Sequence, residues 1–302
     1  MNAADRFVLG TWGLSGAGTA PSASAYGPVS AHSAAETFDR AWEMGLRIVD
    51  TAPAYGGGEG LRRLAHWQRS RGLNWQVAAK PGRPRVDGRP VSRIDPAALL
   101  EEITAGADLV GSPAFVLIKD PDPESYQDGR LAQALDALEW HLPQTTVGVA
   151  SHLPEALAGL SCGTNARVAQ IELNAVNRHV SVPAARRLAK SGWEVWAMQP
   201  LAYGFLARPD RRPQSEDDWR GQIPEHVQAG LCLAARTFAE AVGADAGLEE
   251  RAAAAIAFCL SVPAVSRVVI GPKGPKQLEA AEAALTLVDD ATTLSRLHAW
   301  TP

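Results

Sequence analysis

Charged side chains stand at the ends of three short apolar segments of the sequence. Asp50, Lys80 and Lys119 each end such a segment, and Tyr55 follows in the loop after Asp50. A buried lysine is costly unless it is paired, so we expect Asp50 and Lys80 to form an ion pair beneath the phenol. A cation near a phenol favours the phenolate, which would let Tyr55 exchange protons near neutral pH. The spacing alone also fits a loop tyrosine and a strand-capping aspartate.

The chain uses arginine much more often than lysine. Of its 29 basic residues only five are lysines, and four of these stand at the ends of apolar segments: Lys80, Lys119, Lys273 and Lys276. The last two lie in the segment Gly271–Lys276, where exposed glycine backbone and two cations suit a bound anion. A solvated, charged loop is the alternative interpretation of this segment.

The elements that must position these residues follow a regular alternation. Eight short apolar segments rich in β-branched residues predict strands: Phe7–Trp12, Arg47–Thr51, Gln76–Ala79, Phe115–Ile118, Thr146–Ala150, Val168–Leu173, Glu194–Met198 and Arg267–Ile270. Segments between them have helical spacing and predict helices: Ala31–Met44, Asp95–Ala107, Gly129–His141, Val182–Ser191 and Leu248–Ser261. Strand and helix therefore alternate along the whole chain.

This alternation predicts an α/β fold, a single (β/α)₈ TIM barrel that forms one domain over residues 1–302. An open doubly wound sheet would require a glycine-rich phosphate-binding turn after the first strand, and Gly13–Gly18 lacks that spacing. We interpret Gly13–Gly18 as a mobile first loop and the polar Arg208–Gly221 segment as a long loop. In such a barrel the active site lies at the carboxyl ends of the strands.

The segment Gly45-Leu-Arg-Ile-Val-Asp-Thr-Ala-Pro-Ala-Tyr-Gly56, followed by Val77-Ala-Ala-Lys80, resembles the signature of the aldo-keto reductase family. The resemblance continues along nearly the whole chain. Leu9–Trp12 is similar to the family's first strand, Val147–Ser151 to its fifth, and Val168–Asn174 to its sixth. Within the family, Ile118-Lys-Asp-Pro-Asp122 looks most like the HDPD segment of the D-threo-aldose dehydrogenase branch.

The resemblance implies hydride exchange between NADP(H) and a carbonyl or alcohol, without a metal. Tyr55 would be the proton donor or acceptor, with Asp50 and Lys80 tuning it, and Ser151 and Gln170 would hold the nicotinamide carboxamide. The cofactor positions implied by the resemblance are Ser151, His152, Gln170, Met198, Gln199, Leu201, Gly271, Lys273, Lys276 and Gln277. Trp12 and Asp120 are expected to line the substrate pocket.

Four positions differ from the family pattern. Lys119 replaces a histidine, His152 an asparagine and Met198 an aromatic residue, and Ala280-Ala281 replaces Glu-Asn near the adenine. A second cation about 4 Å from Tyr55 is worth about 4 kcal/mol, roughly three pKa units. We therefore hypothesise that phenolate dominates and favours alcohol oxidation or proton abstraction. Alternatively, Lys119 turns toward Asp120 or Asp122 and only holds the loop.

Composition excludes several other classes. A net charge of −4 gives no basic excess, so a nucleic acid partner is not expected. There is no signal peptide pattern and no apolar stretch long enough to span a membrane, which predicts a cytoplasmic protein. Three widely spaced cysteines indicate reduced thiols and no metal site. The oligomeric state is not encoded in any pattern.

The leading prediction is thus an NADP(H)-dependent oxidoreductase acting on a small polar, sugar-like carbonyl or alcohol. A second interpretation keeps the barrel and uses Tyr55, Lys80 and Lys119 for cofactor-independent elimination or isomerisation. A third is a barrel that only binds or regulates. Trp196 could line the pocket but fits core packing better, and Arg208–Arg212 could close over a cofactor pyrophosphate.

Overall fold

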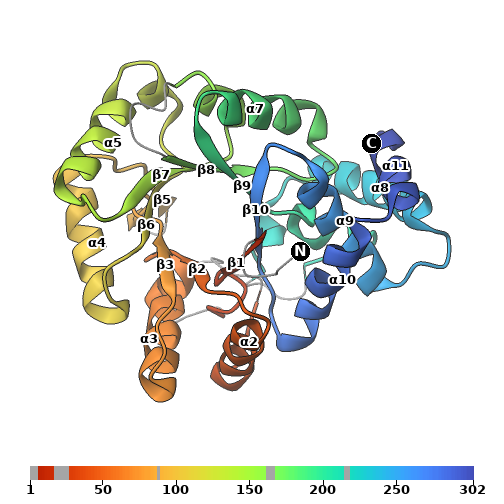
Figure 1. The fold of residues 1–302 in the computed structure, drawn as a ribbon, viewed down its shortest axis with the longest axis horizontal. Helices are drawn as coiled ribbons and strands as arrows, with labels where there is room; N and C mark the ends of the chain where they lie inside the picture. The colour runs from red at the N-terminus through yellow and green to blue at the C-terminus, as the bar shows by residue number, and fades with distance from the viewer. Residues whose placement is uncertain (1–5, 17–26, 87–88, 161–166, 214–217) are drawn as a thin grey trace.

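Eight parallel strands close into a barrel in the computed structural model, which describes residues 6–16, 27–86, 89–160, 167–213 and 218–302. The barrel strands are β1 (Phe7–Gly10), β2 (Ile48–Thr51), β3 (Gln76–Ala79), β6 (Phe115–Lys119), β7 (Thr146–Ser151), β8 (Arg167–Glu172), β9 (Trp193–Met198) and β10 (Val265–Ile270). Their order around the ring is β1-β10-β9-β8-β7-β6-β3-β2 (Figure 1). All eight predicted strands and the (β/α)₈ fold are confirmed.

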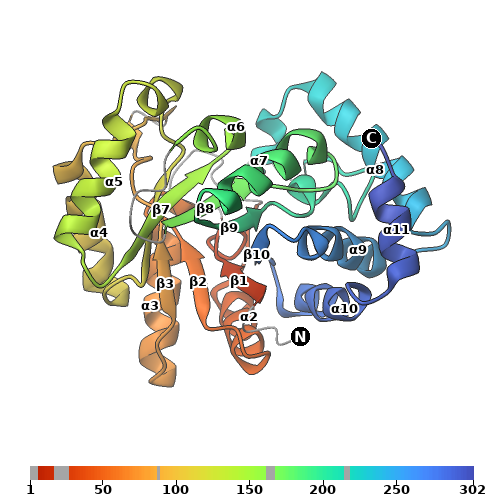
Figure 2. The ribbon, with the colours of Figure 1, turned by 45° about the horizontal axis from the view of Figure 1, so that its top comes forward.

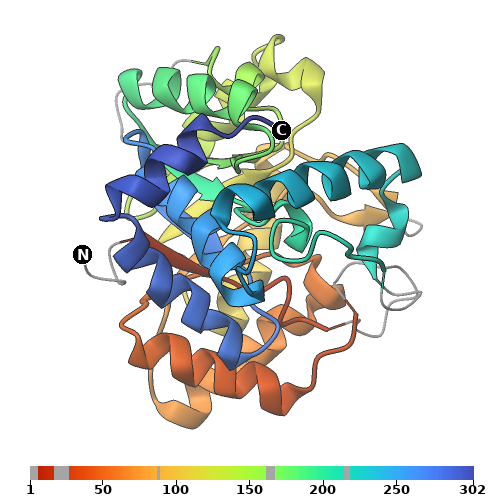
Figure 3. The same ribbon diagram turned by 90° about the vertical axis from the view of Figure 1, so that its right-hand side faces the viewer.

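Helices surround the ring (Figures 1 and 2). They are α2 (Ala31–Glu43), α3 (Glu59–Arg71), α4 (Pro96–Val110), α5 (Arg130–His141), α6 (Pro154–Leu157), α7 (Arg178–Lys190), α8 (Glu225–Val242), α9 (Leu248–Ser261), α10 (Glu279–Leu287) and α11 (Ala291–Ala299). The last helices, coloured blue, pack together along one side of the barrel (Figure 3). The helices α3, α6, α8, α10 and α11 were not among those predicted.

Local sequence explains where several helices begin. The Ser30 side chain accepts a hydrogen bond from the Ser33 amide at the start of α2. Asp95 caps α4 in the same way, and Pro96 occupies its first position, where no amide hydrogen is needed. The predicted start of α7 at Val182 is wrong, because the helix begins at Arg178 and contains Pro183 within its second turn.

Apolar side chains fill much of the barrel interior, and one contact there admits only glycine. The Cβ atom of any larger residue at Gly148 on β7 would lie 1.9 Å from the main-chain oxygen of Val168 on β8. Trp196 is fully buried in this interior and contacts Phe115 edge-on, with ring centroids 5.0 Å apart. Trp196 therefore belongs to the core and not to the pocket wall.

Shorter elements lie in the loops between the strands and helices. The antiparallel hairpin of β4 (Arg85–Val86) and β5 (Arg89–Pro90) follows β3. The 3₁₀ helices are η1 (Tyr55–Gly58), η2 (Pro123–Tyr126), η3 (Ala202–Gly204), η4 (Trp219–Gln222) and η5 (Pro275–Leu278). The predicted Arg208–Gly221 loop thus ends in η4, and the part of Gly13–Gly18 beyond Gly16 lies outside the described residues.

Candidate active site

A cavity of about 950 Å³ opens at the carboxyl ends of the barrel strands. Its wall includes most of the residues that the sequence singled out: Trp12, Asp50, Tyr55, Lys80, Lys119, Asp120, His152, Met198, Gln199, Leu201, Gly271, Lys273, Lys276, Gln277, Ala280 and Ala281. A volume of this size is typical of ligand-binding sites. The fold therefore brings these scattered residues together around one cavity.

The predicted ion pair between Asp50 and Lys80 is present. Parallel pairing of β2 and β3 places the two residues side by side, and Lys80 Nζ lies 2.7 Å from Asp50 Oδ1. Both side chains are less than 5% exposed. Gln170 on β8 joins the pair, because its Oε1 accepts from Lys80 at 3.1 Å and its Nε2 donates to Asp50 Oδ2 at 2.8 Å. The buried charges are thus fully compensated within the barrel.

Tyr55 lies against this pair at the start of η1. Its ring centroid is 5.3 Å from Lys80 Nζ and 5.8 Å from Lys119 Nζ, and the Trp12 ring stacks on it at 6.1 Å. Gly56 adopts a φ of +57°, and a Cβ atom there would lie 2.8 Å from the Ser15 main-chain oxygen. A glycine after Tyr55 therefore allows the tight turn that carries the phenol to the cavity.

The hypothesis that phenolate dominates is wrong. Tyr55 is 7% exposed, and its burial raises the pKa of the phenol above its usual value. Lys119 lowers this pKa, whereas Asp50 and Asp120 raise it. The hypothesis counted the cation but not the loss of hydration, which disfavours the charged form. Tyr55 is consequently a phenol at neutral pH and can donate a proton.

Lys119 turns toward Asp120, as the alternative interpretation predicted. Lys119 Nζ lies 3.2 Å from Asp120 Oδ2, and His152 Nδ1 lies 2.6 Å from Asp120 Oδ1. These two partners hold the pKa of Asp120 well below its usual range despite its burial. The second ring nitrogen of His152 is 3.0 Å from Gln199 Nε2. Asp120 and Gln199 both have positive φ, 41° and 59°, so the network stabilises backbone conformations that are uncommon outside glycine.

Ser151 and Gln170, predicted to hold a carboxamide, are not on the cavity wall. Gln170 bonds to the buried ion pair instead. The Ser151 hydroxyl lies 2.7 Å from the Tyr126 hydroxyl and also accepts from the Leu153 amide. Burial raises the pKa of Tyr126 to about 12, so this contact joins two neutral hydroxyls. Both predicted carboxamide ligands therefore have their polar atoms engaged within the protein.

Positively charged residues gather on the side of the cavity formed by β9, β10 and the loops that follow them. Arg211, Arg220 and Lys273 line the wall there, and Arg220 pairs with buried Asp218 at 2.5 Å. Burial and the nearby guanidinium groups of Arg220 and Arg211 lower the pKa of Lys273. Like charges held this close favour a bound anion. Lys276 is largely exposed and pairs with Glu249 at 3.3 Å.

Two aromatic residues of the wall were not predicted from the sequence. Trp219 on η4 contacts Trp12 edge-on at 5.5 Å and Tyr203 on η3 at 4.9 Å. Trp219 is the one tryptophan in the polar Arg208–Gly221 segment, and this could have indicated a role in the cavity wall. The three rings form an apolar part of the wall next to Arg220, whose Nη1 donates to the Tyr203 main-chain oxygen at 3.2 Å. Glu172 lies behind them, 3.4 Å from the Tyr203 hydroxyl, and burial raises the pKa of its carboxyl group.

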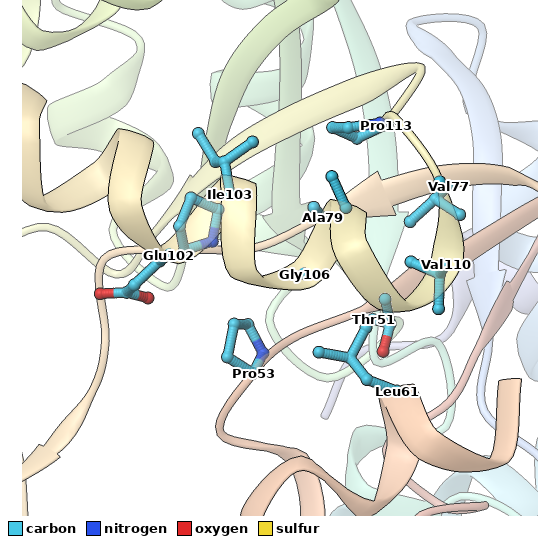
Figure 4. A pocket seen from close by; sticks show the side chains of 13 residues that line it. Thr51, Pro53, Leu61, Val77, Ala79, Glu102, Ile103, Gly106, Val110 and Pro113 are labelled. Atoms are coloured by element: carbon cyan, nitrogen blue, oxygen red, sulfur yellow. The ribbon is translucent and has the colours of Figure 1, made fainter. Parts of the chain in front are cut away.

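A second cavity of about 20 Å³ lies outside the barrel, between α4 and the strands β2 and β3 (Figure 4). Its wall is apolar apart from Thr51 and Glu102. Glu102 accepts a hydrogen bond from the Gly82 amide at 3.2 Å, and burial raises the pKa of its carboxyl group. The volume holds about one water molecule. This cavity is a packing gap between the barrel and its helices.

Two kinds of site are absent from the part of the chain that the structure describes. No group of three or more histidine, cysteine, aspartate or glutamate side chains there is arranged to hold a metal ion. Within the same residues, no helix combines the length and apolarity that crossing a membrane requires.

Aldo-keto reductases are among the solved structures that this chain resembles. The holo form of aldo-keto reductase AKR11C1 from Bacillus halodurans is similar with a TM-score of 0.69 and 16% identity, covering 97% of this chain and 91% of that one. The glycerol dehydrogenase AKR11B4 from Gluconobacter oxydans has the same TM-score and coverage at 20% identity. At such identities these likenesses show the barrel fold alone.

The sequence itself shows the family. The profile of the Aldo/keto reductase family matches residues 6–299, so this chain belongs to that family of oxidoreductases, which typically use NAD(P)(H). A pyridoxal 4-dehydrogenase from Microbacterium luteolum is 30% identical over 110 residues. That match spans 35% of this chain and only 32% of the relative.

Proposed function

We propose that the protein transfers hydride between NADP(H) and a small polar carbonyl compound, with Tyr55 as the proton donor. The observation that carries this proposal is a buried phenol beside two lysines, in a cavity whose wall also carries Arg211, Arg220 and Lys273. A phenol kept neutral at pH 7 can protonate the oxygen of a carbonyl that is being reduced. The reverse reaction, alcohol oxidation, would need the phenolate and is therefore favoured only at high pH.

The cavity fits a phosphorylated dinucleotide. Arg211 and Lys273 offer cations for phosphate groups, whereas the buried charge of Arg220 is balanced by Asp218. Gly271 leaves the neighbouring backbone open, since no heavy atom apart from its chain neighbours lies within 4 Å of the position that a Cβ would take there. The Gln277 side chain already fixes this loop, accepting from the Lys273 amide at 2.7 Å. When bound, the cofactor supplies the hydride. His152, Met198, Gln199, Leu201 and Lys276 are further candidate contacts on the wall.

The side chains around Tyr55 have separate roles in this proposal. Lys80, whose charge Asp50 balances and which donates to Gln170, forms the polar surface beneath the phenol. Lys119 replaces the family's histidine, and its ammonium group, 5.8 Å from the Tyr55 ring centroid, would stabilise the negative charge that develops on the carbonyl oxygen. Asp120 and His152 hold Lys119 in place. A carboxamide contact by Ser151 or Gln170 would require each to exchange its present partner.

Titration of the purified protein with NADPH tests this proposal. We expect saturable binding by nicotinamide fluorescence, and reduction of aldehydes that Tyr55→Phe abolishes while NADPH binding is retained. Absence of NADPH binding together with a Tyr55-dependent elimination or isomerisation would instead support cofactor-independent chemistry at the same groups. If NADPH binding and Tyr55-dependent turnover are both absent, only the third interpretation remains, a barrel that binds or regulates.

A further inference from the structure

Basic residues of the large cavity lie in two groups on opposite sides of the barrel. The first group follows β9 and β10, and the second lies at the ends of β3 and β6 or in the hairpin after β3; they are Arg208, Arg211, Arg220, Lys273 and Lys276, and Lys80, Arg83, Arg85 and Lys119. In the ring order, β9 lies four strands from β3, and β10 lies four strands from β6 (Figure 1). An anion bound by the first group therefore leaves the second group on the far side of the cavity.

Arg83 differs from Lys80 and Lys119 in its partners. Lys80 is neutralised by Asp50, and Lys119 shares the Asp120 carboxylate with His152. The guanidinium group of Arg83 donates from Nη1 to the main-chain oxygen of Asp120 at 3.0 Å, and forms no ion pair with any described residue. A neutral carbonyl acceptor therefore adds no anionic partner for Arg83. Arg83 is half-buried, so solvent screens its charge only in part.

An arginine in this setting suits an anionic group of the ligand. Its planar fork binds a carboxylate or a phosphate through two parallel hydrogen bonds, which fixes the orientation of the ligand as well as adding affinity. The bond to Asp120 already orders the side chain, so less conformational entropy is lost on binding. Asp120 directly follows Lys119, so the anchored guanidinium lies near the ammonium that approaches the Tyr55 ring.

We propose that the carbonyl substrate carries an anionic group, a carboxylate or a phosphate ester, which Arg83 binds while the carbonyl lies at Tyr55. This inference rests on the proposed function, because it names the substrate class of the same site. A purely structural role for Arg83 is the competing account: it would hold Asp120 at its φ of 41° and so support Lys119. That account predicts equal losses for charged and neutral substrates.

A matched pair of aldehydes separates these accounts. The probes are 4-carboxybenzaldehyde and its neutral isostere 4-formylbenzamide, with glyceraldehyde 3-phosphate and glyceraldehyde as the phosphate arm. For the wild type we expect kcat/KM to be at least about tenfold higher for an anionic probe than for its neutral counterpart. Arg83→Gln should lower kcat/KM for the anionic probe about 10- to 100-fold and change that of the neutral probe by less than about twofold.

Two further variants sharpen the result. Arg83→Lys keeps the charge but loses the fork and should retain part of the preference. Arg89→Gln, on the exposed strand β5 of the adjacent hairpin, should leave both values unchanged. Equal losses for both probes in Arg83→Gln, or no preference for either anion in the wild type, would overturn the proposal.

A binding measurement keeps the inference testable if no aldehyde is turned over. The probes are 4-(hydroxymethyl)benzoate and 4-(hydroxymethyl)benzamide, followed by quenching of the tryptophan fluorescence to which Trp12 and Trp219 of the cavity wall contribute. Tighter binding of the benzoate that is lost in Arg83→Gln would uphold the anion site while the proposed reductase activity fails. Equal binding of both compounds would refute the anion site itself.

Discussion

Replacing Lys80 by methionine should destabilise the protein strongly, because it leaves the Asp50 carboxylate buried without its counter-ion. The pair is 2.7 Å apart, and the side chains are 4% and 3% exposed. Breaking such a buried pair typically costs about 3–5 kcal/mol. Gln170 still donates to Asp50 at 2.8 Å, which places the expected loss near the lower limit, about 3 kcal/mol. This is a large part of a typical free energy of unfolding of about 5–15 kcal/mol.

The loss should depend on pH in a defined direction. Without Lys80, the Asp50 carboxyl group is buried without a counter-ion, which favours its protonated form in the folded variant more than in the unfolded chain. The folded variant then binds more protons than the unfolded chain, so its stability decreases as the pH rises above about 3.9. The deficit of Lys80→Met relative to the wild type is therefore largest at neutral pH and shrinks toward pH 4. Asp50→Asn combined with Lys80→Met removes both charges, and this double variant should have a free energy of unfolding within about 1–2 kcal/mol of the wild type.

Urea unfolding followed by circular dichroism at pH 7.5 and pH 5 measures these differences. A loss of less than about 1 kcal/mol for Lys80→Met at pH 7.5 would contradict this prediction. A double variant less stable than the single one would contradict it as well, because the cost would then not come from an uncompensated charge.

Three further predictions concern other parts of the molecule. Asp120→Asn should lower the free energy of unfolding at pH 7 by about 1–3 kcal/mol. Because the folded-state pKa of Asp120 is depressed, this difference in unfolding free energy should shrink as the pH falls from about 3.9, the unfolded value, toward the lower folded-state pKa. Urea titrations over this range that show a constant difference would contradict the prediction. Gly148→Ala should prevent folding, since its Cβ would lie 1.9 Å from the Val168 main-chain oxygen. As a control, Gly106→Ala within α4, where no atom crowds the new Cβ, should raise the free energy of unfolding by about 0.5–1 kcal/mol, measured by thermal denaturation. Lys273→Met should raise the Kd for NADPH about tenfold or more by fluorescence titration, and Lys190→Met, exposed on α7, should not; equal Kd values would exclude a phosphate contact.

The fold and the central ion pair were predictable because both depend on local patterns. Short β-branched segments between helical segments define the strands, and polar residues at their ends must meet at one rim. A lysine placed beside an aspartate on the neighbouring strand needs that partner once it is buried, so Asp50 and Lys80 could be paired from the sequence. The tendency of Lys119 to turn toward Asp120 was visible as an alternative for the same reason.

Other features of the site could not be predicted because they depend on burial and side-chain direction. The pKa of Tyr55 reflects how much water the fold removes from the phenol, and no spacing pattern reports that quantity. Gln170 points toward the ion pair and not the cavity because the two buried charges present it with a donor and an acceptor. Trp219 lies in an irregular segment without periodicity, so only the folded chain shows its contact with Trp12.

The protonation state of Tyr55 decides whether the site works from a phenol or from a phenolate. In protein labelled with ¹³C at the tyrosine Cζ, the resonance of Tyr55 is assigned by its loss in Tyr55→Phe, and its chemical shift is followed as the pH is raised. We predict the shift of a neutral phenol up to at least about pH 10, the ordinary pKa of tyrosine, because burial outweighs the nearby Lys119. A titration midpoint at or below about pH 8 would contradict this prediction and would restore a phenolate as the working form of the site.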